Sequence, residues 1–128
     1  MSKGLVIREA HFPGRAAIDA YGNGGFRFAD MSHRGSLLLL PSGIYGWSVS
    51  SFAELTVDSI QRVLDETAKV EFLLFGMGDG LMPIPADVKA ALKEAGIGSD
   101  PMSTGAAVRT YNVMLAEERA VAAALIAV

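Results

Sequence analysis

Residues 70–75 form a short, almost uninterrupted apolar run, which constrains the fold more than any other feature of the sequence. Runs of this kind are typical of a strand buried on both faces of a partly parallel sheet. The run ends at the glycines of the sequence GMGDG, and Pro85 follows in a position suited to the first turn of a helix. The sequence of residues 70–85 therefore predicts a strand, a loop and the start of a helix, in that order.

The rest of the second half continues this alternation. After Pro85, apolar residues at helical spacing predict a helix with one face directed at the core, and Gly96 is expected to end this helix. We expect another short strand over residues 97–102, followed by a helix capped by Ser103 or Thr104. The sequence RAVAAALIAV then predicts a closing strand, so that the second half reads βαβαβ.

The first half reads as short strands separated by glycine turns, in the segments LVIREA, AAIDAYG, FRFADMS, SLLLLP and YGWSVS. Residues 22–25 predict a hairpin reversal. Thr56 is expected to cap a first helix, because apolar residues then recur at helical spacing. Trp47 is interpreted as a buried strand aromatic, with a partner anchor as the alternative.

These elements predict an α/β fold with a mixed central sheet, packed helices and a smaller antiparallel sheet beside it. The 128 residues are about one domain long, and 51% of them are hydrophobic, so we expect a single domain over residues 1–128 with its own core. The sequence contains no internal repeat and no linker.

Composition argues against several classes of function. The formal net charge of −3, without any basic run, argues against nucleic-acid binding. The chain has no cysteine, which excludes disulfides, thiolate metal sites and cysteine nucleophiles. The apolar runs are too short for a transmembrane segment and the N-terminus lacks a signal sequence, so we expect a cytoplasmic protein.

No motif for catalysis or metal binding stands out. His11 and His33 have no carboxylate at a spacing typical of a zinc site or a catalytic triad, and both are interpreted as surface or turn residues. Ser36 and Ser42 lack the G-x-S-x-G elbow of a hydrolase nucleophile. We therefore expect no cofactor, no metal and no catalytic residues, and whether the chain is an enzyme stays open, with a non-enzymatic role preferred.

A candidate cleft is predicted where the buried strand meets the glycine turn, because open α/β sheets commonly bind ligands there. The turn fails the dinucleotide fingerprint, since Leu81 stands where a small residue is needed, and a plain structural turn is the preferred interpretation. A side chain such as Arg109 could hold a carboxylate, although one surface arginine is ordinary. The candidate residues are Gly76, Gly78, Asp79, Thr104, Arg109, Tyr111 and Asn112.

The segments GMGDGLMPIP, MSTGAAVRTYNVMLAEER and RAVAAALIAV, taken in this order, resemble the family typified by mitochondrial complex I assembly factor three and the adipogenesis-associated Mth-domain proteins. The resemblance spans nearly the whole chain. The matching positions are Gly76, Gly78, Pro85, Thr104, Ala107, Tyr111, Asn112, Arg119 and Val121. The chain departs from the family at Glu117 and Glu118, where relatives usually turn through glycine.

The resemblance implies a three-layer α/β fold with a cleft, and it leaves the biochemical activity unassigned. It also implies a non-enzymatic binding or assembly factor with a protein partner, with contact to a membrane complex only at its surface. A small-molecule site or an unrecognised enzyme near the GMGDG turn is the alternative. A homo-oligomer formed through the apolar strands is a third possibility. A partner-binding role predicts an exposed apolar patch, which could include Tyr45, Trp47 and Phe52.

Overall fold

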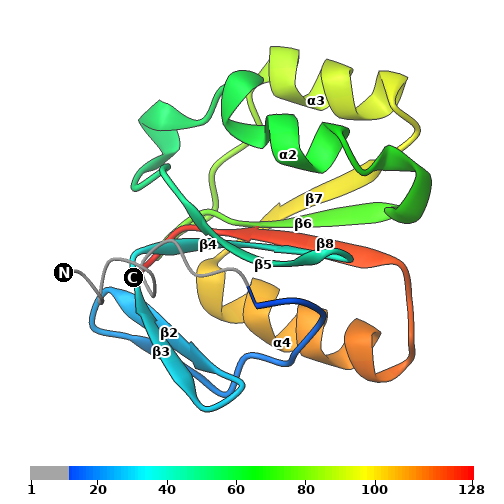
Figure 1. Ribbon diagram of the computed structural model, residues 1–128. Coiled ribbons are helices and arrows are strands. Elements are labelled where there is room, and N and C mark those ends of the chain that lie inside the picture. Colours follow the sequence, from blue (N-terminus) through cyan, green and yellow to red (C-terminus); the bar gives the residue numbers. More distant parts are fainter. Residues whose placement is uncertain (1–11) are drawn as a thin grey trace, which may run out of the picture.

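The computed structural model describes residues 12–128, which form a five-stranded sheet, a three-stranded sheet and three α-helices (Figure 1). The larger sheet has the order β5-β4-β8-β6-β7 and comprises β4 (Ser36–Leu40), β5 (Gly43–Trp47), β6 (Phe72–Gly76), β7 (Gly98–Met102) and β8 (Val121–Leu125). The smaller sheet comprises β1 (Ala20–Gly22), β2 (Gly25–Phe28) and β3 (Met31–Arg34), in that order. The helices are α2 (Gln61–Leu64), α3 (Ala86–Glu94) and α4 (Thr104–Ala116), and short 3-10 helices span η1 (Phe52–Glu54), η2 (Asp58–Ile60) and η3 (Thr67–Lys69).

The larger sheet is mixed, as the sequence predicts. Strand β6 lies between β7 and β8 and is parallel to both, whereas β4 is antiparallel to β5 and β8. Because β6 has a neighbour on each side and a covered surface on each face, nearly all of its side chains are buried. The predicted order β6-α3-β7-α4-β8 is confirmed.

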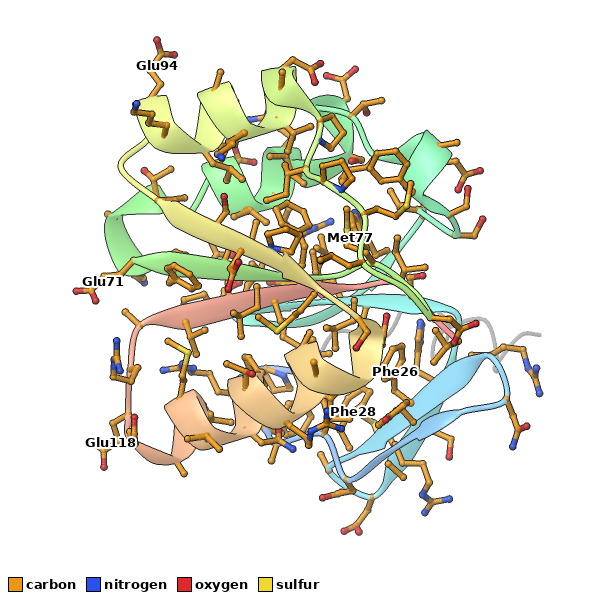
Figure 2. All side chains as sticks on the ribbon, turned by 180° about the vertical axis from the view of Figure 1, so that it is seen from behind. Phe26, Phe28, Glu71, Met77, Glu94 and Glu118 are labelled. Atoms are coloured by element: carbon orange, nitrogen blue, oxygen red, sulfur yellow. The ribbon has the colours of Figure 1, made fainter. Side chains whose placement is uncertain are left out.

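Two layers cover the larger sheet (Figure 1). Helices α2 and α3 lie on one face, and α4 lies on the other face together with the smaller sheet. Each face has its own core: Met77 belongs to the first, and Phe26 and Phe28 belong to the second (Figure 2). The predicted three-layer α/β arrangement, with a smaller antiparallel sheet beside the central one, is therefore confirmed.

The glycine turn of the first half is a tight hairpin between β1 and β2. Gly22 pairs with Gly25, which leaves Asn23 and Gly24 as the two loop residues, both with positive φ. This is the backbone geometry that two-residue hairpins favour, and Asn-Gly is the pair that adopts it most readily. The predicted reversal at residues 22–25 is confirmed.

Several expectations for the first half need correction or lie outside the described residues. The predicted strand in LVIREA and the residue His11 fall outside residues 12–128. His33 is not a surface residue: it lies on β3 with 5% of its surface exposed, and its Nε2 is 3.1 Å from the Ser36 carbonyl oxygen. Its side chain faces the core because alternate β3 residues point to opposite faces of the sheet.

The first predicted helix is shorter than expected. Thr56 stands one residue before the N-cap, which is Val57, and its Oγ1 accepts a hydrogen bond from the Ser59 N–H over 3.2 Å within the first turn. That turn is the 3-10 helix η2, and only the four residues of α2 follow as α-helix. Trp47 is buried, and its Nε1 donates to the Ser59 carbonyl over 2.7 Å, which confirms the strand-aromatic interpretation.

Helices α3 and α4 end in the same way with different residues. Gly96 ends α3 with φ of 80°, whereas Glu118 takes the corresponding position after α4 with φ of 58° (Figure 2). After α4 the Arg119 N–H donates to the Met114 carbonyl and the Glu118 N–H to the Leu115 carbonyl, a Schellman pattern. The turn that lacks the expected glycine is therefore formed by a glutamate held in the left-handed region.

Candidate functional site

The carboxyl ends of the parallel strands meet at a small hydrogen-bonded junction centred on Thr104. Its hydroxyl donates to the Ile126 carbonyl over 2.7 Å and accepts from the Gly78 N–H over 3.0 Å. The Thr104 N–H in turn donates to the Gly78 carbonyl over 2.8 Å. Thr104 has no exposed surface. Its side chain, which was predicted to line a cleft, is buried and links the ends of β6 and β8 to the start of α4.

Gly76 belongs to the same junction. A Cβ at this position would lie 3.0 Å from both the Thr104 Cα and the Leu125 Cδ2, which is closer than ordinary side-chain contacts. A side chain at the end of β6 would therefore press against α4 and β8, which favours glycine at this position. Gly78 has a φ of 97°, a backbone conformation that residues with a side chain rarely adopt, and the chain turns away from the junction here.

Beyond Gly78 the chain runs out to the surface. Asp79 and Gly80 are exposed, and they are followed by two exposed apolar residues, Leu81 at 70% and Met82 at 39%. A pair of adjacent, solvent-facing apolar side chains is a costly arrangement unless something covers it. This loop, residues 79–82, is the most exposed apolar feature of the junction region.

Tyr111 lies on the buried face of α4, and 1% of its surface is exposed. Burial raises the pKa of the Tyr111 hydroxyl, and the nearby Arg15 guanidinium opposes this rise. The Arg15 Nη2 donates to the Arg119 carbonyl over 2.7 Å, so this arginine ties the segment before β1 to the entry of β8. Sequence reasoning missed Arg15, because nothing in its local sequence indicates a partner 104 residues away.

The buried tyrosine predicts a specific pH dependence of stability. Below the ordinary tyrosine pKa of 10.0 both the folded and the unfolded chain keep the Tyr111 proton. As the pH rises through that value the unfolded chain releases it first, so the free energy of unfolding decreases. We expect urea denaturation between pH 8 and pH 11 to show a steeper loss of stability in the unaltered chain than in Tyr111→Phe. Parallel curves for the two proteins would contradict this assignment.

Asn112 binds the segment that precedes β1. Its amide oxygen accepts from the Ile18 N–H and its amide nitrogen donates to the Ile18 carbonyl, both over 2.9 Å. The side chain thus pairs with both backbone groups of Ile18, as a neighbouring strand would. Asn112 therefore anchors α4 to this segment, and its amide is occupied by Ile18.

The seven candidate residues therefore fall into separate groups. Gly76, Gly78 and Thr104 meet at the junction, and Asp79 lies just outside it in the exposed loop. Tyr111 and Asn112 face the core and the segment before β1. Arg109 is exposed on α4 and, within residues 12–128, forms no hydrogen bond or ion pair. The cleft itself stays a prediction.

Three open grooves of about 470, 510 and 470 Å³ lie elsewhere on the surface, and none of the seven candidate residues lines them. Two of them share His33 and Arg34 on β3, and two share Arg62 on α2. The described part of the chain contains no group of three histidine or acidic side chains able to hold a metal ion. Over the same residues, every helix is too short or too polar to cross a membrane.

Comparison with known proteins gives a consistent match. Residues 18–126 match the family model described as protein of unknown function (DUF498/DUF598). An uncharacterized protein of Rhodobacter capsulatus is 37% identical over 95% of this chain and 93% of its own length. The human NADH dehydrogenase [ubiquinone] 1 alpha subcomplex assembly factor 3 is 30% identical over 85% of this chain and 59% of its own length. The present chain therefore spans little more than half of that assembly factor.

Two solved structures share the fold. A protein from Bartonella henselae, described as an outer membrane protein, is 60% identical with a TM-score of 0.88, and the match covers 91% of this chain and 98% of that one. A Mth938-like domain from Bordetella pertussis is 27% identical with a TM-score of 0.77, covering 87% of this chain and 85% of that one. The resemblance to Mth-type proteins is thereby confirmed.

Proposed function

Because the chain belongs to the DUF498/DUF598 family and is similar in sequence to an assembly factor of NADH dehydrogenase, we propose that it binds a protein partner during the assembly of a respiratory complex. The partner class in this proposal is a subunit or assembly intermediate of an NADH dehydrogenase. A cytoplasmic location, with contact to the membrane-bound complex only at its surface, belongs to the same proposal.

The observation that carries this proposal is the apolar loop formed by Leu81 and Met82. The loop begins at the junction of Gly78 with Thr104 and runs on into Pro83 and Pro85, so its base is attached to buried structure. A leucine that is 70% exposed beside a methionine offers an apolar contact of the kind found at the centre of protein interfaces. The cost of leaving these side chains in water is recovered when a partner covers them.

The apolar patch expected around Tyr45, Trp47 and Phe52 is not the surface that we propose. Trp47 is 8% exposed and is bound to Ser59, while Tyr45 and Phe52 are half-buried against the core that contains Met77. These aromatic residues pack inward, so the exposed apolar side chains of the loop carry the proposal instead.

Replacing Leu81 with aspartate tests the proposal. In the host cells, affinity-tagged chain is expected to co-purify with NADH dehydrogenase subunits, and Leu81→Asp is expected to reduce their yield at least about tenfold, the loss typical of an interface anchor. The control is Val113→Asp, because Val113 is 58% exposed but lies on the far part of α4. Quantitative mass spectrometry of the purified samples measures the yield. Equal loss in both variants, or no NADH dehydrogenase subunit with the unaltered chain, would contradict the proposal.

The small-molecule alternative near the GMGDG turn stays a prediction. The Thr104 hydroxyl already uses one donor and one acceptor bond inside the junction, and Asn112 already pairs with Ile18. No contact among residues 12–128 favours this alternative over partner binding.

A further inference from the structure

An open groove with an unusual charge lies on the β4–β5 edge of the larger sheet, and no residue of the GMGDG turn lines it. We call it the arginine groove. It has a volume of about 510 Å³ and is lined by His33, Arg34, Gly35, Ser36, Tyr45, Gly46, Trp47, Ser48 and Arg62. Two of these residues are arginines and none is an aspartate or glutamate, although the chain as a whole carries a net charge of −3.

The two arginines come from different layers of the molecule. Arg34 ends β3 in the smaller sheet and Arg62 lies on α2, on the opposite side of the β4–β5 edge (Figure 1). Both side chains are exposed, and neither forms an ion pair within the described residues. Asp58 and Asp65 line the neighbouring groove beyond Arg62 without pairing with it. Both guanidinium groups are therefore available to an anion.

A backbone donor lies on the edge between the two arginines. In the antiparallel pair of β4 and β5, backbone groups alternate between pointing toward and away from the partner strand. Ile44 points away, because its N–H and carbonyl pair with Phe12 over 3.0 and 3.1 Å. Gly46, two residues further on, must point the same way, and its N–H has no partner among residues 12–128.

The walls of the arginine groove are held in place by their own contacts. The Trp47 indole is fixed by its hydrogen bond to the Ser59 carbonyl, and the His33 Nε2 lies 3.1 Å from the Ser36 carbonyl oxygen. The Arg62 guanidinium lies 4.2 Å from the centre of the Tyr45 ring, a cation–π contact that positions it above the edge strand. A site with fixed walls loses less entropy when it binds a ligand.

We propose that the arginine groove binds the phosphate group of a small phosphorylated compound. Two guanidinium forks from different layers, the Gly46 N–H and the Ser48 hydroxyl line the same groove. Several donors on different elements suit a tetrahedral anion with several oxygens better than a planar carboxylate. The groove is larger than a bare phosphate, so the phosphate is one end of a larger molecule. The adjoining groove, which shares His33 and Arg34 and adds Arg27, has room for the remainder.

Binding of inorganic pyrophosphate to the full chain tests this proposal. Isotope-labelled protein is titrated at constant ionic strength, with the amide of Gly46 and the indole of Trp47 followed by NMR. We expect both signals to shift with saturation, and Arg62→Gln and Arg34→Gln each to weaken binding about tenfold, the loss of one charged hydrogen-bonding partner. Arg62→Lys, which keeps the charge without the fork, is expected to fall between these variants and the unaltered chain.

The control is Lys93→Gln, which removes an exposed positive charge from α3, outside all three grooves, and is expected to leave binding unchanged. An equal loss in this control would mean non-specific charge attraction and would overturn the proposal, as would a Gly46 amide that does not respond. A second arm uses vesicles of phosphatidylglycerol, with neutral phosphatidylcholine vesicles as reference. Sedimentation with the anionic vesicles, without any response to pyrophosphate, would assign the groove to a lipid surface and overturn the small-compound proposal.

Discussion

Replacing Thr104 with valine is expected to lower the free energy of unfolding by about 2–4 kcal/mol, although the two side chains have almost the same shape. The valine leaves the Gly78 N–H without its acceptor and the Ile126 carbonyl without its donor, at a position with no exposed surface. Buried polar groups that lose their partners keep the full cost of desolvation. Urea denaturation followed by circular dichroism measures the loss.

The matched control is Thr104→Ser, which keeps the hydroxyl and removes only a buried methyl group. We expect it to cost about 1 kcal/mol, so that most of the stability remains. A serine variant that loses as much stability as the valine variant would mean that the buried methyl group contributes as much to the junction as the two hydrogen bonds do. A valine variant as stable as the unaltered chain would show that the hydroxyl serves something other than the fold.

The elements of the second half were predictable because their signals are local. Val88 and Leu92 recur at helical spacing and are buried against the sheet, Gly96 ends α3 with positive φ, and the Ser103 hydroxyl caps α4 by accepting from the Ala106 N–H over 3.3 Å. Each signal lies within a few residues of the structure that it specifies, so one sequence is enough to interpret it.

The contacts of the candidate site were not predictable in the same way. Thr104 meets Gly78 across 26 residues and Asn112 meets Ile18 across 94, so the sequence gives the residue type without its partner. A polar side chain in a helix is equally compatible with a ligand, a solvent contact and a tertiary hydrogen bond. The exposure of Leu81 could not be predicted either, because an apolar residue after a buried strand is usually expected to pack into the core.

Replacing Asn112 with alanine is expected to lower the free energy of unfolding by about 2 kcal/mol, because both backbone groups of Ile18 lose their partner. Alanine is the better helix former, so a part of the loss is offset and any remaining loss comes from the contact with Ile18. We expect Asn112→Asp to be no better: its carboxylate can still accept from the Ile18 N–H, but its second oxygen faces the Ile18 carbonyl without a proton to donate.

The same exchange at Arg109, which is exposed on α4, is expected to change stability by less than about 0.5 kcal/mol and serves as the control. Hydrogen exchange of the Ile18 amide provides a local readout, since its protection should fall in Asn112→Ala, which removes its acceptor, and remain in Arg109→Ala. If Asn112→Ala keeps both the global stability and the Ile18 protection, the pairing contributes nothing to the fold. The Asn112 amide would then be free for a ligand, and the cleft predicted from the sequence would become the better explanation for this residue.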